Sequence, residues 1–145
     1  MSRVVAKATV VYVQTRAHFL CEYCKIPNPF GFARFEIDHI IAKAHRGTDE
    51  LNNLAWSCLT CNSNKGPNLS SIDPESGRLA RLFHPRVDKW PLHFQLSEGL
   101  IVAKTAQGRA TISLLKMNVR QTFILRRTLE QIETGYAELV KRRCV

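Results

Sequence analysis

The sequence predicts an α+β fold: two short strands and a short helix braced by two cysteine pairs, then a β-hairpin region, then C-terminal helices. Three observations carry this prediction. The pairs Cys21/Cys24 and Cys58/Cys61 have the CxxC spacing of metal-binding turns. Apolar residues alternate with polar ones in "ARFEIDHII", as in a half-buried strand. In the tail of the chain, apolar residues recur at three- and four-residue steps, which is typical of helices.

The charge balance favours a polyanionic partner. The chain has 21 Lys and Arg residues against 12 Asp and Glu residues, a net charge of +9, and such an excess is typical of proteins that bind nucleic acid. A basic surface that serves only solubility would give the same count. The apolar stretch "VVAKATVVYV" is interrupted by Lys7, and no stretch is long enough to span a membrane. The sequence therefore predicts a soluble, cytoplasmic protein.

The 145 residues fit a single domain, 1–145, whose four segments follow from the motifs and turn signals. Residues 1–20 form a lead-in without Pro or Gly that predicts a helix up to "RAHFL", although β-branched valines leave a strand open at its start. Residues 21–66 hold a Pro- and Gly-rich knuckle, the strand "ARFEIDHII", a polar loop and the second strand "LAWSC". A short helix follows, with Thr60 or Asn62 as its cap and "KGP" at its end.

Residues 67–108 predict strands and loops, and residues 109–145 predict helices. A turn at Asp73–Gly77 precedes a strand over Leu79–Phe83. The stretch "HFQLSEGLIVAKTAQG" predicts a hairpin that turns at Glu98–Gly99. Asn118 and Gly135 are the positions that could divide the final helical stretch into two helices.

Four of the five cysteines predict a structural zinc site. Two CxxC turns present four thiolates, which complete a tetrahedral Zn²⁺ shell and leave no open position for catalysis. A redox function of one CxxC pair or an iron–sulfur cluster are the alternatives. The fifth, Cys144, lies next to the C-terminus, and we interpret it as an idle thiol.

The segment between and after the cysteine pairs resembles a known family. It contains, in order, "CEYC", "FEIDHI", "ELNNLAWSC", "CNSNKG" and the later "SIDPESG" and "LFHPR". Over roughly residues 16–90 the chain resembles the HNH endonuclease family, in its branch with a four-cysteine zinc site. The resemblance implies the ββα-metal module of that family, two strands and a helix around a catalytic divalent ion.

The residue types suit phosphodiester hydrolysis, which needs a nucleophilic water and charge neutralisation at the phosphate. His39 supplies an imidazole able to take a proton from water near neutral pH. Asp38 and Asn62 supply the oxygen ligands that Mg²⁺ or Mn²⁺ prefers. The resemblance implies the same roles: His39 as general base, and Asp38 and Asn62 as ligands of one divalent ion. It also implies that Asn53 is the central asparagine, which braces the loop and orients His39.

Neighbouring residues leave alternatives open. Asn52 could replace Asn53, and Asn64 could compete with Asn62 as the ligand. Lys65 could contact the phosphate backbone or only cap the helix end.

Other positions near the motif have less defined roles. His45 could approach the metal or a phosphate, and loop solvation is the equal alternative. Trp56 is expected in the core, and His18, His84 and His93 are expected to be ordinary. The chain departs from the family pattern at Ala42, where proline is common, and at Arg46, where a second glycine is common.

The geometry of a regular strand conflicts with the joint use of Asp38 and His39, since adjacent residues point to opposite faces. A distortion of the strand at these two residues is therefore expected.

The predicted function is a metal-dependent DNA endonuclease. The alternative is a zinc-stabilised nucleic-acid-binding module that cuts nothing. The C-terminal helices could instead serve a protein partner or a homodimer contact. The basic residues expected to hold the DNA backbone include Arg120, Arg126, Arg127, Lys141, Arg142 and Arg143.

Overall fold

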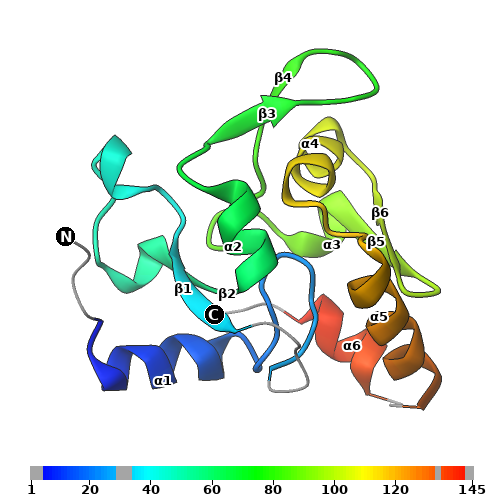
Figure 1. Cartoon of the computed structure of the whole chain (residues 1–145), viewed down its shortest axis with the longest axis horizontal. Helices are drawn as coiled ribbons and strands as arrows, with labels where there is room; N and C mark the ends of the chain where they lie inside the picture. Colours follow the sequence, from blue (N-terminus) through cyan, green and yellow to red (C-terminus); the bar gives the residue numbers. More distant parts are fainter. Residues whose placement is uncertain (1–4, 29–33, 133–134, 143–145) are drawn as a thin grey trace.

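A β-hairpin between two helices organises the N-terminal half of the chain (Figure 1). The computed structural model describes residues 5–28, 34–132 and 135–142. Strand β1 (Phe35–His39) pairs antiparallel with β2 (Leu54–Cys58). Both strands lie within the predicted stretches "ARFEIDHII" and "LAWSC", and the mixed helices and antiparallel strands confirm the α+β class.

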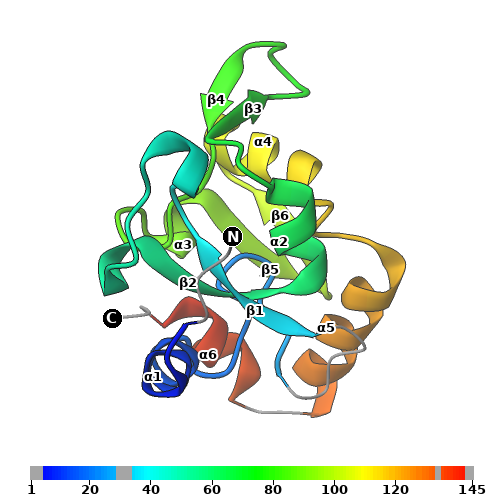
Figure 2. The same cartoon turned by 60° about the vertical axis from the view of Figure 1, so that its left-hand side comes forward.

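Helices α1 and α2 lie on opposite sides of this hairpin (Figure 2). Helix α1 (Lys7–Arg16) confirms the helix prediction over the strand alternative. Its residue Val13 is fully buried in a small cluster with the β2 residues Leu54 and Trp56, so Trp56 is a core residue as expected. Helix α2 (Leu59–Lys65) follows β2 without a loop.

Two short 3₁₀ turns lie within the β1–β2 hairpin, and a second hairpin follows α2. The loop between β1 and β2 contains the 3₁₀ turns η1 (Lys43–His45) and η2 (Leu51–Asn53). After α2, β3 (Ser70–Ile72) pairs with β4 (Leu79–Arg81) across the predicted turn at Asp73–Gly77. The sequence did not predict β3, because three residues are too few for a recognisable alternation. Strand β4 also ends before the predicted Phe83, which is buried in the core.

The third hairpin has the predicted turn. Helix α3 (Trp90–His93) leads into β5 (Phe94–Ser97), which pairs with β6 (Leu100–Ala103). Glu98 and Gly99 form the two-residue loop, and both have positive φ, 49° and 86°. Two left-handed residues are what a type I′ turn requires.

Three helices, rather than two, form the C-terminal part. They are α4 (Ala106–Leu115), α5 (Arg120–Ile132) and α6 (Tyr136–Lys141). The breaks lie at the predicted positions, next to Asn118 and Gly135. Helix α4 starts before the predicted Arg109, because the Thr105 hydroxyl accepts a hydrogen bond from the Gly108 amide and caps the helix there.

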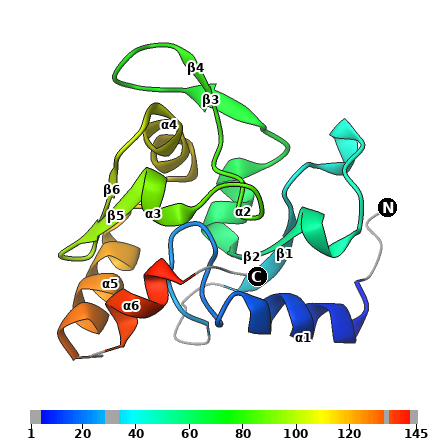
Figure 3. The same ribbon diagram turned by 180° about the vertical axis from the view of Figure 1, so that it is seen from behind.

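The main core joins the first cysteine pair to the C-terminal helices (Figure 3). It contains all four paired cysteines together with aromatic and aliphatic residues such as Tyr23, Phe83, Trp90, Phe94, Leu115 and Val140. The Tyr136 hydroxyl of α6 donates to the carbonyl of Lys25, directly after the first pair. None of the helices in the described residues is both long and apolar enough to cross a membrane.

Candidate functional site

The four paired cysteines form one buried cluster. The sulfur atoms of Cys21, Cys24, Cys58 and Cys61 all lie within 4.8 Å of one another, and Cys24 Sγ and Cys58 Sγ are 3.7 Å apart. A tetrahedral shell with Zn–S bonds of about 2.3 Å has sulfur–sulfur edges of about 3.8 Å. The cluster therefore has the donors and the spacing of a four-thiolate metal site, and its closed shell suits structural zinc.

Cys58 connects this metal site to α2. It is the N-cap residue of the helix, and its Sγ accepts a hydrogen bond from the Cys61 amide at 3.4 Å. The prediction that Thr60 or Asn62 caps the helix is therefore wrong, because a thiolate sulfur at the last position of β2 accepts the amide instead. Metal binding and the start of α2 depend on the same atom.

Buried side chains tie the first cysteine pair to the rest of the chain. Glu22, inside the CxxC turn, accepts from the Trp56 amide at 2.7 Å and forms an ion pair with Arg86 of the "LFHPR" stretch. Arg126 of α5 is fully buried, and its guanidinium donates to the carbonyl of Cys24. Arg126 therefore does not hold DNA, and that prediction is wrong. Arg143, predicted for the same role, and Cys144 lie outside the described residues.

Strand β1 runs regularly through Asp38 and His39. Asp38 pairs with Ala55 and His39 pairs with Leu54 in the same unbroken register as the rest of the strand. The expected distortion at these two residues is therefore wrong, and the alternation of a regular strand directs their side chains to opposite faces. Asp38 shares its face with Glu36, toward α2.

Asp38 is buried and paired within the protein. Its Oδ2 accepts from the Tyr23 hydroxyl at 2.6 Å, and its Oδ1 accepts from Lys65 Nζ at 3.2 Å. Burial raises the pKa of Asp38, and the neighbouring Lys65 ammonium opposes this shift. Lys65 is itself 2% exposed, so it neither caps the helix end at the surface nor presents its charge to solvent. The carboxylate is thus neutralised by a cation that the protein supplies.

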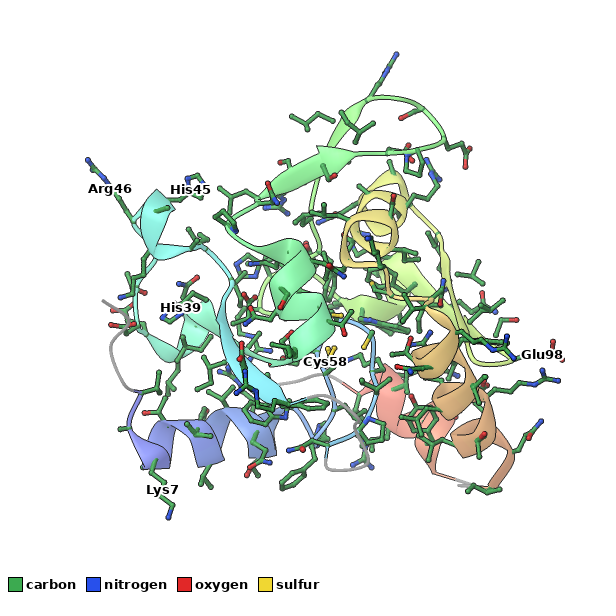
Figure 4. The ribbon with its side chains drawn as sticks, viewed as in Figure 1. Lys7, His39, His45, Arg46, Cys58 and Glu98 are labelled. Carbon is green, nitrogen blue, oxygen red and sulfur yellow. The ribbon has the colours of Figure 1, made fainter. Side chains whose placement is uncertain are left out.

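His39 lies on the other side of β1, facing the η1–η2 loop (Figure 4). Its side chain is 26% exposed, and its Nε2 is 2.8 Å from Asp49 Oδ1. The same oxygen accepts from Lys43 Nζ at 2.8 Å. Hydrogen bonds from Lys43 and His39 lower the pKa of Asp49 to about 2, so this carboxylate is ionised at neutral pH. His39 is therefore an accessible imidazole held by a charged partner.

Asn53 braces the loop that carries Asp49. Its Oδ1 accepts from the Ile41 amide at 2.9 Å, and its Nδ2 donates to the carbonyls of Ile41 and Thr48 at 3.0 and 2.8 Å. These bonds join the two ends of the 41–48 loop. Its own carbonyl accepts from the amide of Ile40, next to His39. The contact of Asn53 with the His39 neighbourhood thus runs through the backbone.

Asn62 lies on the Asp38 side of the strand. Its Nδ2 donates to Glu36 Oε2 at 2.6 Å. Sequence reasoning missed Glu36, although its position two residues before Asp38 assigns it to the same strand face. Glu36, Asp38 and Asn62 supply the hard oxygen donors that suit Mg²⁺ or Mn²⁺. The chemistry of this set fits a divalent ion, with Asp38 already engaged by Lys65.

The alternative candidates lie away from these groups. Asn64 Nδ2 donates to the carbonyl of Leu115 and ties α2 to α4. His45 is exposed in η1 and, like Arg46, points outward from the loop (Figure 4). Asp49 was also missed by sequence reasoning, and only its place in the polar loop ten residues after His39 could have indicated it.

Comparison with known proteins identifies the segment that carries these residues. A family model described as HNH endonuclease matches residues 21–68, which include both cysteine pairs, β1, β2 and α2. No curated protein and no solved structure matches the chain. The match over residues 21–68 and the four-cysteine cluster that the structure brings together fit the branch of the HNH endonuclease family that has a zinc site.

Proposed function

We propose that this protein is a metal-dependent endonuclease that hydrolyses phosphodiester bonds in DNA. The observation that carries the proposal is the match of the HNH endonuclease family to the segment that folds as β1–β2–α2 around a four-cysteine site. The net charge of +9 supports a polyanionic substrate. Contacts to the DNA backbone are consistent with both the family match and the charge.

His39 is the proposed general base. Partial exposure lets a water molecule reach its ring, and the contact with Asp49 holds the ring in one orientation. An imidazole nitrogen with a free lone pair can take a proton from the attacking water. Asn53 supports this role indirectly, since it braces the loop that presents Asp49.

Asp38 and Asn62 are the proposed ligands of one Mg²⁺ or Mn²⁺ ion, and Glu36 is a further oxygen donor beside them. When bound, such an ion supplies positive charge for the phosphate and for the departing 3′-oxygen. Use of Asp38 requires that Lys65 gives up its place on Oδ1. Joint use of Asp38 and His39 also requires β1 to depart from its regular course, because the two side chains lie on opposite faces of the strand. The proposed products carry 5′-phosphate and 3′-hydroxyl ends.

The buried pair of Asp38 and Lys65 favours a second candidate function. If Lys65 remains on Asp38, and His39 remains on the opposite face, the module binds nucleic acid and does not cut it. The zinc site and the basic charge are kept in this candidate. The two functions differ only in whether the β1 residues perform chemistry.

A plasmid-nicking assay separates the two candidates. The purified, zinc-loaded protein is incubated with supercoiled DNA and Mg²⁺ or Mn²⁺, next to His39→Ala and to His45→Ala, which removes an exposed imidazole from the neighbouring turn. Removal of a general base lowers the rate by about 10²–10⁴-fold. We expect nicking by the wild type and by His45→Ala, and its loss in His39→Ala. A wild-type protein that binds DNA but leaves it intact with several divalent ions would favour the second candidate.

A further inference from the structure

A cluster of three polar side chains lies at the end of β1: His39 belongs to the predicted site, whereas Asp49 and Lys43 lie outside the predicted set. Asp49 Oδ1 lies 2.8 Å from His39 Nε2 and 2.8 Å from Lys43 Nζ. All three side chains are partly exposed, at 26% for His39, 40% for Asp49 and 54% for Lys43. The cluster is therefore reachable by solvent and is not part of the core.

The loop between the strands delivers Asp49 to this position. Asn53 bonds both ends of the 41–48 stretch, to Ile41 and to Thr48, immediately before Asp49. Gly47 lies so close to the carbonyl of Ile41 that a Cβ there would be 1.6 Å from the oxygen. The loop is closed tightly at Gly47, where a side chain has no space. The backbone of the loop therefore holds Asp49 next to His39.

The hydrogen bond determines which ring nitrogen carries the proton. A neutral imidazole has one N–H donor and one nitrogen with a lone pair, and an ionised carboxylate can only accept. Nε2 therefore holds the proton and donates it to Asp49 Oδ1, which leaves the lone pair on Nδ1. A His ligand or base commonly has its tautomer and ring orientation set by the partner of its other nitrogen.

We infer that Asp49 is the positioning residue of His39, which fixes the ring so that Nδ1 is the nitrogen that accepts a proton from water. The inference rests on the proposed function for its catalytic consequence, whereas the tautomer itself does not depend on it. In the reaction, Nδ1 takes a proton from water and the hydroxide oxygen forms a bond to phosphorus. The bond from phosphorus to the 3′-oxygen breaks, its electron pair stays on that oxygen, and a solvent water protonates it. The imidazolium then returns its proton to solvent.

Lys43 provides the internal comparison. Lys43 bonds the same oxygen of Asp49. If Asp49 served only this ion pair, its removal would affect the conformation of the loop but not the orientation of the His39 ring. An exposed pair of this kind contributes about 0–1 kcal/mol to stability. Removing Lys43 leaves the carboxylate facing His39, while removing Asp49 affects both neighbours.

The test compares Asp49→Asn, Asp49→Ala and Lys43→Gln in the full-length, zinc-loaded chain. The first readout is the ring tautomer of His39, from long-range proton–nitrogen correlation spectra of ¹⁵N-histidine-labelled protein at about pH 8, where an ordinary imidazole is neutral. We expect the Nε2–H form in the wild type and in Lys43→Gln. In Asp49→Asn the amide NH₂ can donate to Nε2, so the Nδ1–H form becomes populated; in Asp49→Ala the ring loses its fixed orientation.

The second readout is cleavage of plasmid DNA. We expect Asp49→Asn to lower kcat by about 10²-fold or more at unchanged KM, because the base is in the wrong tautomer. Lys43→Gln should keep the wild-type kcat. The inference is overturned if the wild-type ring carries its proton on Nδ1, if both Asp49 variants keep the wild-type tautomer, or if Lys43→Gln lowers kcat as much as Asp49→Asn does. A wild type that cleaves nothing but has the expected tautomers would overturn the proposed function and leave the positioning of His39 by Asp49 standing.

Discussion

Replacing Arg126 with methionine removes the cation that ties α5 to the first cysteine pair. Arg126 is fully buried, and its guanidinium donates to four oxygens of three segments. The acceptors are the carbonyls of Cys24, Gly99 and Met117 and the side-chain oxygen of Asn118, at 2.7–3.2 Å. Methionine fills much of the volume of the aliphatic stem but donates no hydrogen bond.

The size of the effect follows from these four acceptors. A buried acceptor left without its donor costs about 1–3 kcal/mol. Part of this cost is offset, because the variant no longer has to bury a charged guanidinium. We therefore expect a loss of about 3–5 kcal/mol in the free energy of unfolding, the part of the cost of four unsatisfied acceptors that remains after this offset. For a chain of this size, such a loss corresponds to a decrease of about 10–16 °C in Tm.

Urea and thermal denaturation followed by circular dichroism, with zinc in excess, measure this loss. The matched control is Arg127→Met, since Arg127 is the next residue of α5 and its side chain is exposed; we expect a change of about 0.5 kcal/mol or less there. Arg126→Lys keeps the charge but has one donor nitrogen, and it should lie between the two. Equal midpoints for Arg126→Met and Arg127→Met would refute the reasoning that these buried bonds stabilise the C-terminal part.

Two further predictions concern the metal site and the pH dependence of stability. Cys58→Ser should lose bound zinc and folded structure together, because Cys58 belongs to the four-cysteine cluster and is also the N-cap of α2. Metal analysis and circular dichroism check this. Cys144→Ser is the cysteine control, and loss of zinc in that variant would contradict the assignment. Burial holds the pKa of His84 below its ordinary value of 6.5, so the unfolded chain binds more protons and the wild type should lose stability as the pH falls below about 6.5. In His84→Asn, the side-chain oxygen can replace Nδ1 as the acceptor for the Arg86 and Val87 amides. The urea midpoint of this variant should fall less than that of the wild type over the same pH range. An equal dependence of the midpoint on pH in both proteins would disprove the contribution of His84.

The local parts of the fold could be predicted from the sequence. Strand β1 shows its alternation within five residues, β2 is a short apolar run between polar segments, and the Glu98–Gly99 turn depends on the two residues that form it. Even the two breaks in the C-terminal helices lie at residues that disfavour a continuous helix. Errors began where the deciding groups come from other elements, such as the carbonyls of Cys24 and Gly99 that accept from the buried Arg126.

For the candidate site, too, the sequence predicted the residues of the motif but not their partners. The motif order pointed to His39, Asp38, Asn53 and Asn62, but their partners come from segments that only folding brings together. Tyr23 and Lys65 reach Asp38 from opposite ends of the module, at separations of 15 and 27 residues in the chain. No periodicity or spacing encodes such pairs, because they depend on how the elements pack.

By itself, the sequence determined the class of fold, the four cysteines and the family resemblance, since these depend on residue type and short spacing. The tertiary structure alone decided three points that carry the chemistry. It kept β1 regular, so that Asp38 and His39 lie on opposite faces. It buried Arg126, which charge counting had assigned to DNA, and it brought Asp49 to the ring of His39. The physical reason is that burial and pairing of a charge depend on everything packed around it, whereas the sequence shows only its neighbours in the chain.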